Sequence, residues 1–176
     1  MTHDVFISHS SHDRDAADAA SIALEQRGFR CWIAPRDLDP GRDYGEAVAE
    51  AIAAARVFLL IFSAATDARE IGKAAEAGLP MVALRVSDAP VGAGLDRLLV
   101  SAQWVDALTP PIAPHLDYLG DTVAELLDSA RRGSLPATGP PGPHRATPLW
   151  LPIALAGAAG VAAIALAAAY VGSKPG

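Results

Sequence analysis

Two stretches of the sequence decide the fold, and each runs from a short apolar strand straight into a polar loop. The first is residues 4–11 (DVFISHSS) and the second is residues 31–41 (CWIAPRDLDPG). The apolar residues of each stretch favour a strand, and the Ser, Asp, Pro and Gly residues that follow favour a loop. In parallel sheets, side chains placed in this way lie at the carboxyl edge of the strands, where ligands bind.

Outward from these stretches, short apolar runs alternate with amphipathic helical patterns. The apolar runs predict strands at residues 5–7, 29–33, 57–62, 81–86 and 104–105. Apolar residues that recur every three or four positions predict helices over residues 13–26, 44–55, 66–77 and 115–132. The most apolar run, residues 57–62 (VFLLIF), is expected at the centre of a sheet buried on both faces. This alternation predicts an α/β fold with a doubly wound, parallel, five-stranded sheet of the flavodoxin-like kind.

The composition narrows the range of partners and compartments. The chain of 176 residues carries a formal net charge of -6 at neutral pH. This charge argues against a nucleic-acid partner, which would require a basic surface. Cys31 is the only cysteine, so an intramolecular disulfide is excluded and a reducing compartment is expected. We interpret Cys31 as a small, buried apolar residue within a strand, and a reactive thiol is the less favoured alternative.

The composition changes sharply after the predicted domain of residues 1–132. Residues 133–148 contain five prolines and three glycines, which predicts an extended linker. Residues 149–171 contain no charged residue and are long enough as a helix to span a membrane. Trp150 and Tyr170 stand at the two ends of this segment, where interfacial aromatic residues belong. We therefore predict one carboxy-terminal transmembrane helix.

The charges that flank residues 149–171 predict the orientation of this helix. Arg131, Arg132 and Arg145 precede it, and only Lys174 follows it. The positive-inside rule then holds the domain on the cytoplasmic side and leaves residues 172–176 as a short tail across the membrane. The sequence thus predicts a single-pass, tail-anchored protein.

Three segments together resemble the Toll/interleukin-1 receptor (TIR) domains of bacteria. They are the two stretches quoted above and residues 103–111 (QWVDALTPP), and they occur in the family's order within roughly residues 1–130. The resemblance implies the flavodoxin-like fold of TIR domains. It also implies one of two functions, because bacterial TIR domains either cleave NAD+ between nicotinamide and ribose or act as protein interaction modules.

The resemblance also points to a catalytic carboxylate. Residues 69–80 (REIGKAAEAGLP) are similar to the segment that carries the family's catalytic glutamate, and Glu70 occupies the matching position. Nicotinamide is already cationic in NAD+ and leaves as a neutral molecule, so one ionised carboxylate could orient the ribose and stabilise its developing positive charge. Spacing alone favours a different role, in which Glu70 completes a capping box with Asp67. With the resemblance taken into account, the catalytic role of Glu70 is favoured over the capping role.

Loop residues supply the remaining candidates for substrate binding. Ser8, His9 and Ser10 follow the first strand, where they could meet phosphate or ribose, although a loop rich in helix caps is the alternative. The other candidates are Arg36, Asp37 and Ser63. Arg36 and Asp37 lie in a segment that resembles the loop gating the NAD+ pocket of TIR domains, and a solvated turn is the alternative.

We expect neither a metal site nor a resident cofactor. His9 has no carboxylate or cysteine partner at the spacing of a metal site. The sequence also lacks a Gly-rich phosphate loop of the Rossmann or Walker type. The resemblance to TIR domains implies NAD+ as a substrate instead.

These observations favour a membrane-anchored NAD+ nucleosidase (NAD+ glycohydrolase) that releases nicotinamide in defence or signalling. The resemblance implies that self-association with other TIR domains activates such an enzyme. Residues 63–68 (SAATDA), which precede the candidate glutamate, form a shorter loop than in relatives. A non-catalytic adaptor that binds other TIR domains in signal transduction therefore stays open as the alternative.

Overall fold

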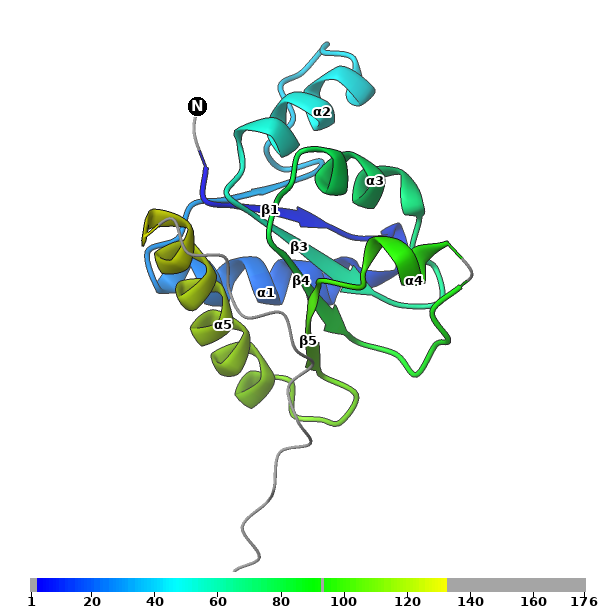
Figure 1. Cartoon of the computed structure of the whole chain (residues 1–176), viewed down its shortest axis with the longest axis vertical. Helices are drawn as coiled ribbons and strands as arrows, with labels where there is room; N and C mark the ends of the chain where they lie inside the picture. Colours follow the sequence, from blue (N-terminus) through cyan, green and yellow to red (C-terminus); the bar gives the residue numbers. More distant parts are fainter. Residues whose placement is uncertain (1–2, 93, 133–176) are drawn as a thin grey trace, which may run out of the picture. The chain divides into compact units, whose positions relative to one another are not determined.

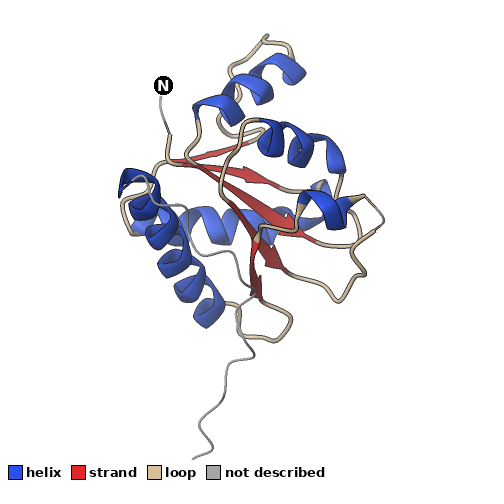
Figure 2. Cartoon of the chain, viewed as in Figure 1, coloured by secondary structure: helices blue, strands red, loops and turns tan. Residues whose placement is uncertain are grey.

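A computed structural model describes residues 3–92 and 94–132 of the chain. In this part of the chain, parallel strands form one sheet in the order β2-β1-β3-β4-β5 (Figure 2). The strands are β1 (Val5–Ser8), β2 (Cys31–Ile33), β3 (Val57–Phe62), β4 (Met81–Arg85) and β5 (Gln103–Asp106). The helices are α1 (Arg14–Gln26), α2 (Tyr44–Ala54), α3 (Ala68–Glu76), α4 (Leu95–Leu98) and α5 (Ala113–Arg132), with a 3-10 turn η1 (Ser11–Asp13) before α1. This order confirms the predicted flavodoxin-like sheet of five strands.

The apolar run of residues 57–62 forms the central strand β3, as predicted. Leu59 pairs with Ile7 of β1 on one side and with Val82 of β4 on the other. Every residue of β3 is at most 2% exposed. A strand that is paired on both edges and covered on both faces is apolar at every position, which explains why this run shows no alternation.

The two faces of the sheet bury separate apolar layers, because side chains alternate along each strand. Along β3, Val57, Leu59 and Ile61 pack in the layer beneath α1 and α5. The alternate residues Phe58, Leu60 and Phe62 pack in the layer beneath α2, α3 and α4. Figure 1 shows these two groups of helices on opposite faces of the sheet.

Most element boundaries differ from the prediction by one or two residues, and two elements begin two residues later than predicted for identifiable local reasons. Strand β2 begins at Cys31 rather than at Phe29, because the Phe29 N–H donates to the carbonyl of Leu24 (3.2 Å) and closes the end of α1. Gly28, at φ +87°, makes this turn. Helix α3 begins at Ala68 rather than at Thr66, whose hydroxyl instead accepts from the backbone N–H of Ser63 (2.9 Å). The short helix α4 and the 3-10 turn η1 were not predicted.

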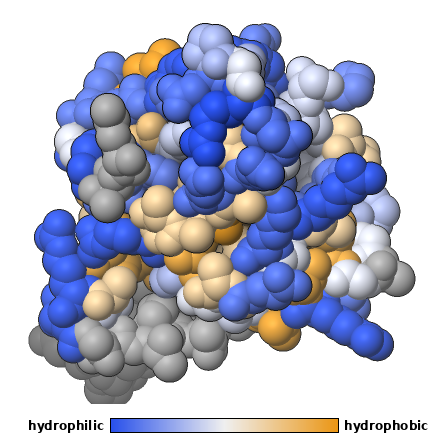
Figure 3. All heavy atoms as spheres, turned by 90° about the horizontal axis from the view of Figure 1, so that it is seen from above, coloured by the Kyte–Doolittle hydropathy of each residue, from blue (hydrophilic) through white to orange (hydrophobic). Residues whose placement is uncertain are grey.

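Exposed apolar side chains lie on separate elements. They include Ile22 on α1, Val100 after α4, Leu108 after β5 and Tyr118 on α5. Figure 3 shows one face of the molecule, where hydrophilic side chains cover most of the surface and apolar atoms show between them. Single exposed apolar residues are ordinary on a protein surface.

The predicted membrane anchor cannot be placed on this fold. No helix within residues 3–92 and 94–132 combines the length and the apolar composition needed to cross a membrane. The linker at residues 133–148, the predicted span at residues 149–171 and the tail at residues 172–176 lie outside the described residues. The anchor therefore stays a prediction.

Candidate functional site

Two neighbouring cavities lie at the carboxyl edge of strands β1 and β3. The larger has a volume of about 310 Å³ and the smaller about 230 Å³. In the flavodoxin-like order, the chain passes from one face of the sheet to the other between these two strands, and ligands bind in the resulting crevice. The larger cavity is lined by Phe6, Ile7, His9, Ser11, Arg14, Ala34, Pro35, Leu38, Tyr44 and Glu70. The smaller is lined by Ser8, His9, Ser10, Tyr44, Leu60, Ile61, Ala65, Thr66, Asp67, Arg69 and Glu70.

Glu70 lies on the wall that the two cavities share. It is half-buried in the first turn of α3, where the helix dipole favours a negative charge. The hydroxyl of Tyr44 lies 3.4 Å from Glu70 Oε1. This arrangement puts a carboxylate at the junction of the cavities, within reach of a ligand that enters either of them.

The contacts around Glu70 do not show the capping box that spacing alone favoured. Asp67 caps helix α3 by accepting a hydrogen bond from the N–H of Arg69 (3.0 Å). The hydrogen bond that Glu70 forms in the described part of the chain is with Tyr44 rather than with the backbone of Asp67. The guanidinium of Arg69 pairs with the carboxylate of Asp67, with 3.8 Å between Nε and Oδ2. Among the described residues, Glu70 therefore has no ion pair that would offset its negative charge.

The predicted residues Ser8, His9 and Ser10 lie beside Glu70 in the smaller cavity. Ser8 is the last residue of β1, and His9 lines both cavities. The His9 ring joins two loops, because Nδ1 lies 2.7 Å from the carbonyl of Ser10 and Nε2 lies 3.1 Å from the carbonyl of Ala34. The structure thus brings this predicted group together with the predicted carboxylate.

Ser63 does not line either cavity but is buried in a polar network beneath one of them. Its hydroxyl donates to Asp13 Oδ2 at 2.6 Å and accepts from the N–H of Ala65 at 3.1 Å. Ser10 donates to the same Asp13 oxygen, at 2.5 Å. Asp13 therefore ties the loop after β1 to the loop after β3. The spacing of Ser10 and Asp13 signals a local cap in the sequence, but nothing in it signals the contact with Ser63.

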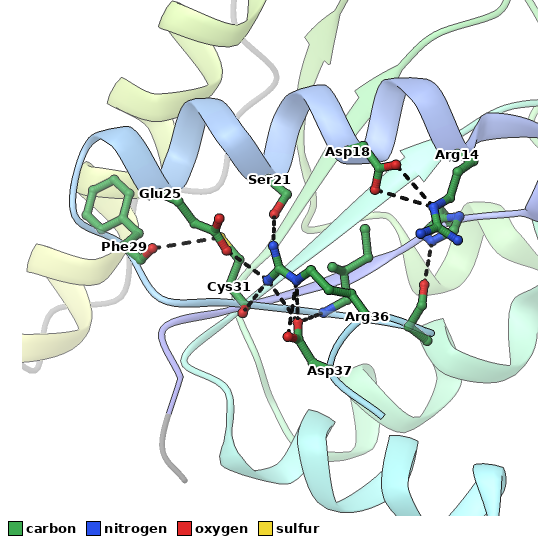
Figure 4. Close-up of polar contacts among 11 residues, drawn as sticks. Arg14, Asp18, Ser21, Glu25, Phe29, Cys31, Arg36 and Asp37 are labelled. Carbon is green, nitrogen blue, oxygen red and sulfur yellow. Dashed lines mark hydrogen bonds and ion pairs between the residues drawn. The ribbon is translucent and has the colours of Figure 1, made fainter. Parts of the chain in front are cut away.

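Arg36 lines neither cavity, and its side chain points toward helix α1 (Figure 4). Its guanidinium donates to the hydroxyl of Ser21 (3.0 Å) and to the carbonyl of Cys31 (3.1 Å). It also pairs with Glu25 and with Asp37, each at 2.8 Å. The hydrogen bond with Asp37 is the main reason why the pKa of Arg36 is raised above its ordinary value. Arg36 thus holds the loop after β2 against helix α1.

Asp37 has the same structural role in this loop. Its Oδ2 accepts a hydrogen bond from the backbone N–H of Ile33 at 2.9 Å, which closes the turn that follows β2. Other residues of the same loop line the larger cavity, namely Ala34, Pro35 and Leu38. The structure therefore separates Arg36 and Asp37 from Glu70, and it places their apolar neighbours at the site instead.

The sequence did not single out Tyr44, Arg14 or Arg69 as site residues. Tyr44 lines both cavities, and burial together with the negative charge of Glu70 raises the pKa of its phenol. Arg14 lines the larger cavity while it pairs with Asp18 at 3.1 Å. An aromatic residue at a helix start carries no pattern that would have marked Tyr44 in advance.

Neither a reactive thiol nor a metal-binding cluster is found in the described part of the chain. Burial raises the pKa of the Cys31 thiol to about 12, and the negative charge of Glu25 adds to the effect. No group of three or more His, Cys, Asp or Glu side chains within residues 3–92 and 94–132 could hold a metal ion. The chemistry available at the cavities is therefore that of the Glu70 carboxylate, the Tyr44 phenol, the His9 imidazole and nearby hydroxyls.

Comparison with known proteins places this site in a family. A protein from Magallana gigas named stimulator of interferon genes protein is 31% identical over 128 residues, which are 72% of this chain and 28% of that protein. The chain thus spans less than a third of the length of this relative.

Solved structures share the fold at low sequence identity. The TIR domain of the Toll-related receptor TRR-2 from Hydra magnipapillata superposes with a TM-score of 0.57 at 17% identity, covering 70% of this chain and 99% of that one. The CMP N-glycosidase BcmB of Clostridium botulinum superposes with a TM-score of 0.52 at 14% identity, covering 67% of this chain and 98% of that one. A family model described as TIR domain matches residues 5–113. Because that match covers more than half of the sequence, the chain belongs to the TIR-domain family.

Proposed function

We propose that this TIR domain is an NAD+ nucleosidase that releases nicotinamide, with Glu70 as its catalytic carboxylate. The observation that carries the proposal is the position of Glu70, half-buried on the wall shared by two cavities and without an ion pair among the described residues. A carboxylate neutralised by a neighbouring arginine would stabilise a developing cation poorly. Here Arg69 and Arg14 pair with Asp67 and Asp18 instead.

Cleavage requires the protein to orient the ribose and to stabilise its developing positive charge. The bond between ribose C1′ and the nicotinamide nitrogen breaks, and both of its electrons leave with nicotinamide, which becomes neutral. The positive charge then develops on the ribose, where the Glu70 carboxylate stabilises it. Water attacks C1′ and releases a proton, so the products are ADP-ribose, nicotinamide and a proton. The naming of the fold neighbour BcmB as an N-glycosidase supports chemistry of this class on this fold.

The size of the cavities supports activation by self-association. The larger cavity, about 310 Å³, is at the lower end of the range of about 300–1,000 Å³ for small-molecule sites. A dinucleotide would have to occupy both cavities and extend beyond them. A second copy of the domain placed against the opening would supply the missing contacts.

We propose that residues 149–171 anchor the protein in a membrane with the TIR domain in the cytoplasm. The apolar, uncharged character of this segment supports the anchor. Anchoring confines copies to a plane and raises their effective concentration, which favours an assembly-dependent site. After a carbonate wash, the full-length chain should pellet with membranes, and a chain that lacks residues 149–176 should not. Full-length protein in the supernatant would refute the anchor.

One observation favours the alternative, a signalling adaptor that binds other TIR domains without chemistry. The short loop between β3 and α3 is closed by its own hydrogen bonds, from Ser63 N–H to the Thr66 hydroxyl (2.9 Å) and from Ala65 N–H to the Ser63 hydroxyl (3.1 Å). This loop lines the smaller cavity through Ala65 and Thr66 and limits its volume to about 230 Å³.

Nicotinamide release from NAD+ distinguishes the two functions. The assay compares full-length wild type, Glu70→Gln and Glu76→Gln, each clustered on lipid vesicles. Glu76 is the matched control, because it is an exposed glutamate at the end of the same helix. We expect Glu70→Gln to lose about 100-fold or more in rate, by analogy with the loss of other groups that stabilise transition-state charge. Glu76→Gln should retain the rate of the wild type.

Each outcome of this assay decides between the assignments. Equal nicotinamide release by Glu70→Gln and wild type would remove Glu70 from the mechanism. A wild type that is inert at every protein density on the vesicles would favour the adaptor. Denaturation midpoints of the three proteins control for folding, since the polar contact that the substitution alters is worth about 1 kcal/mol.

A further inference from the structure

Tyr44 is the side chain, besides His9 and Glu70, that lines both cavities. It is the first residue of α2, directly after the cap Asp43, whose carboxylate accepts from the N–H of Glu46 at 2.9 Å. The residue is 53% exposed and lines both cavities, so its side chain borders the space in which a ligand would lie. The backbone of Tyr44 is thus held by a capped helix end while its side chain stands at the opening.

The hydroxyl of Tyr44 is aimed at the carboxylate of Glu70. The distance to Oε1 is 3.4 Å, which is long compared with about 2.5–3.0 Å for a strong O–H···O hydrogen bond. Hydrogen bonds in catalytic sites are often long in the free protein and shorten when the substrate binds. Burial and the charge of Glu70 raise the pKa of the Tyr44 phenol, so the hydroxyl keeps its proton at neutral pH and acts as a donor.

One further hydrogen bond and a shared apolar layer join α2 to α3. The ammonium of Lys73 donates to the carbonyl of Gly45 at 3.4 Å. Below it, Ile52 of α2 and Ile71 of α3 are buried in the same apolar layer. The approach of Tyr44 to Glu70 therefore follows from the packing of α2 against α3.

We propose that Tyr44 is a positioning residue for Glu70. By donating to Oε1, its hydroxyl fixes the rotation of the carboxylate and leaves Oε2 for the ribose of the substrate. This inference rests on the proposed cleavage of NAD+ and adds a second residue to that reaction. Tyr44 takes no proton and forms no bond to the substrate in this role.

The first test is the kinetic effect of Tyr44→Phe, which removes the hydroxyl and keeps the ring. With vesicle-bound, full-length protein, we expect kcat for nicotinamide release to fall about tenfold, the effect of one hydrogen bond to a charged group, while KM changes less than twofold. Tyr118→Phe is the control, because Tyr118 is a half-exposed tyrosine on α5, across the sheet from α3. It should keep the kcat of the wild type.

The second test does not require activity. The titration of Tyr44 is followed by phenolate absorbance, as the difference between each protein and its Tyr44→Phe derivative. Wild type and Glu70→Gln are compared, with the other charged groups near Tyr44 (Asp43, Arg69 and Lys73) and the His9 ring left unchanged. We expect the phenol pKa to be lower in Glu70→Gln, because the negative charge that helps to raise it is gone.

The outcomes separate this inference from the proposed function. An unchanged Tyr44 titration in Glu70→Gln would overturn the contact, whatever the activity. A Tyr44→Phe variant with the kcat of the wild type, beside an inactive Glu70→Gln, would overturn the positioning role and leave the nucleosidase intact. A wild type without NAD+ cleavage would refute the proposed function, and the positioning role of Tyr44 with it. A lowered kcat together with a lowered phenol pKa would support both.

Discussion

Replacing Arg36 by methionine should destabilise the domain far more than the same change at Arg14. Both arginines stand on the surface, with 39% and 44% of their side chains exposed. Arg14 makes one ion pair along its own helix, with Asp18. Arg36 instead contacts two carboxylates, a buried hydroxyl and a backbone carbonyl, on three segments of the chain (Figure 4).

The expected magnitude follows from these contacts. The ion pairs with Glu25 and Asp37 are partly solvated and are worth about 0.5 kcal/mol each. The hydrogen bonds to the Ser21 hydroxyl and the Cys31 carbonyl are worth about 1 kcal/mol each. Methionine keeps most of the apolar stem, so its packing loss is small. We therefore expect Arg36→Met to lower the free energy of unfolding by about 2–3 kcal/mol, against about 0.3–0.5 kcal/mol for the Arg14 control.

Urea unfolding of the full-length chain in lipid, followed by tryptophan fluorescence, measures both losses. The shift of the midpoint at constant slope gives the change in stability. Arg36→Lys keeps the charge but lacks the planar fork, so it should recover less than half of the loss. A difference below about 0.5 kcal/mol between the Arg36 and Arg14 variants would refute the argument that the fork fastens this loop, since surface changes without such contacts fall within that range.

Three further predictions concern stability and reactivity. Burial raises the pKa of Asp4, but the hydrogen bonds and charge of Arg30 lower it more, to below 3.8. The stability that Asp4 contributes is therefore present above pH 3.8 and is lost as the pH falls through its lowered folded-state pKa. In acid unfolding, Asp4→Asn should be less stable than wild type above pH 3.8, and the difference in stability should vanish as the pH falls through that pKa. With a pKa of about 12, Cys31 should react with iodoacetamide at pH 8 slowly when folded and faster in urea, and equal rates would contradict its burial. Gly28→Ala, at φ +87°, should cost about 1 kcal/mol, whereas Gly72→Ala inside α3 should stabilise by about 0.5–1 kcal/mol in the same urea assay.

The architecture could be predicted from the sequence because its signals are local. A strand buried on both faces is continuously apolar, as residues 57–62 are, and an amphipathic helix repeats every three or four residues. Alternation of these patterns, together with the right-handed crossover of parallel strands, leaves few topologies to consider. Ser8, His9 and Ser10 reach the cavities for the same reason, since a polar run directly after a strand must lie at the edge of the sheet.

The pairings of individual side chains were decided by the tertiary structure alone. Ser63 is buried because Asp13, 50 positions earlier in the sequence, accepts its hydrogen bond. Tyr44 meets Glu70 across 26 positions because α2 packs against α3. Such contacts require two atoms to lie about 3 Å apart, a distance that depends on how helices and loops pack.

Arg36 is a case in which a residue predicted at the site lies elsewhere in the structure. Its segment resembles the loop that gates the NAD+ pocket of TIR domains, which predicted a site residue. Arg36 instead contacts Glu25, Ser21 and the carbonyl of Cys31. A periodic pattern specifies which face of an element is buried, because burial of apolar area is summed over many residues. It cannot specify which of several nearby acceptors a long side chain will choose, since that choice depends on distances set by the packed fold.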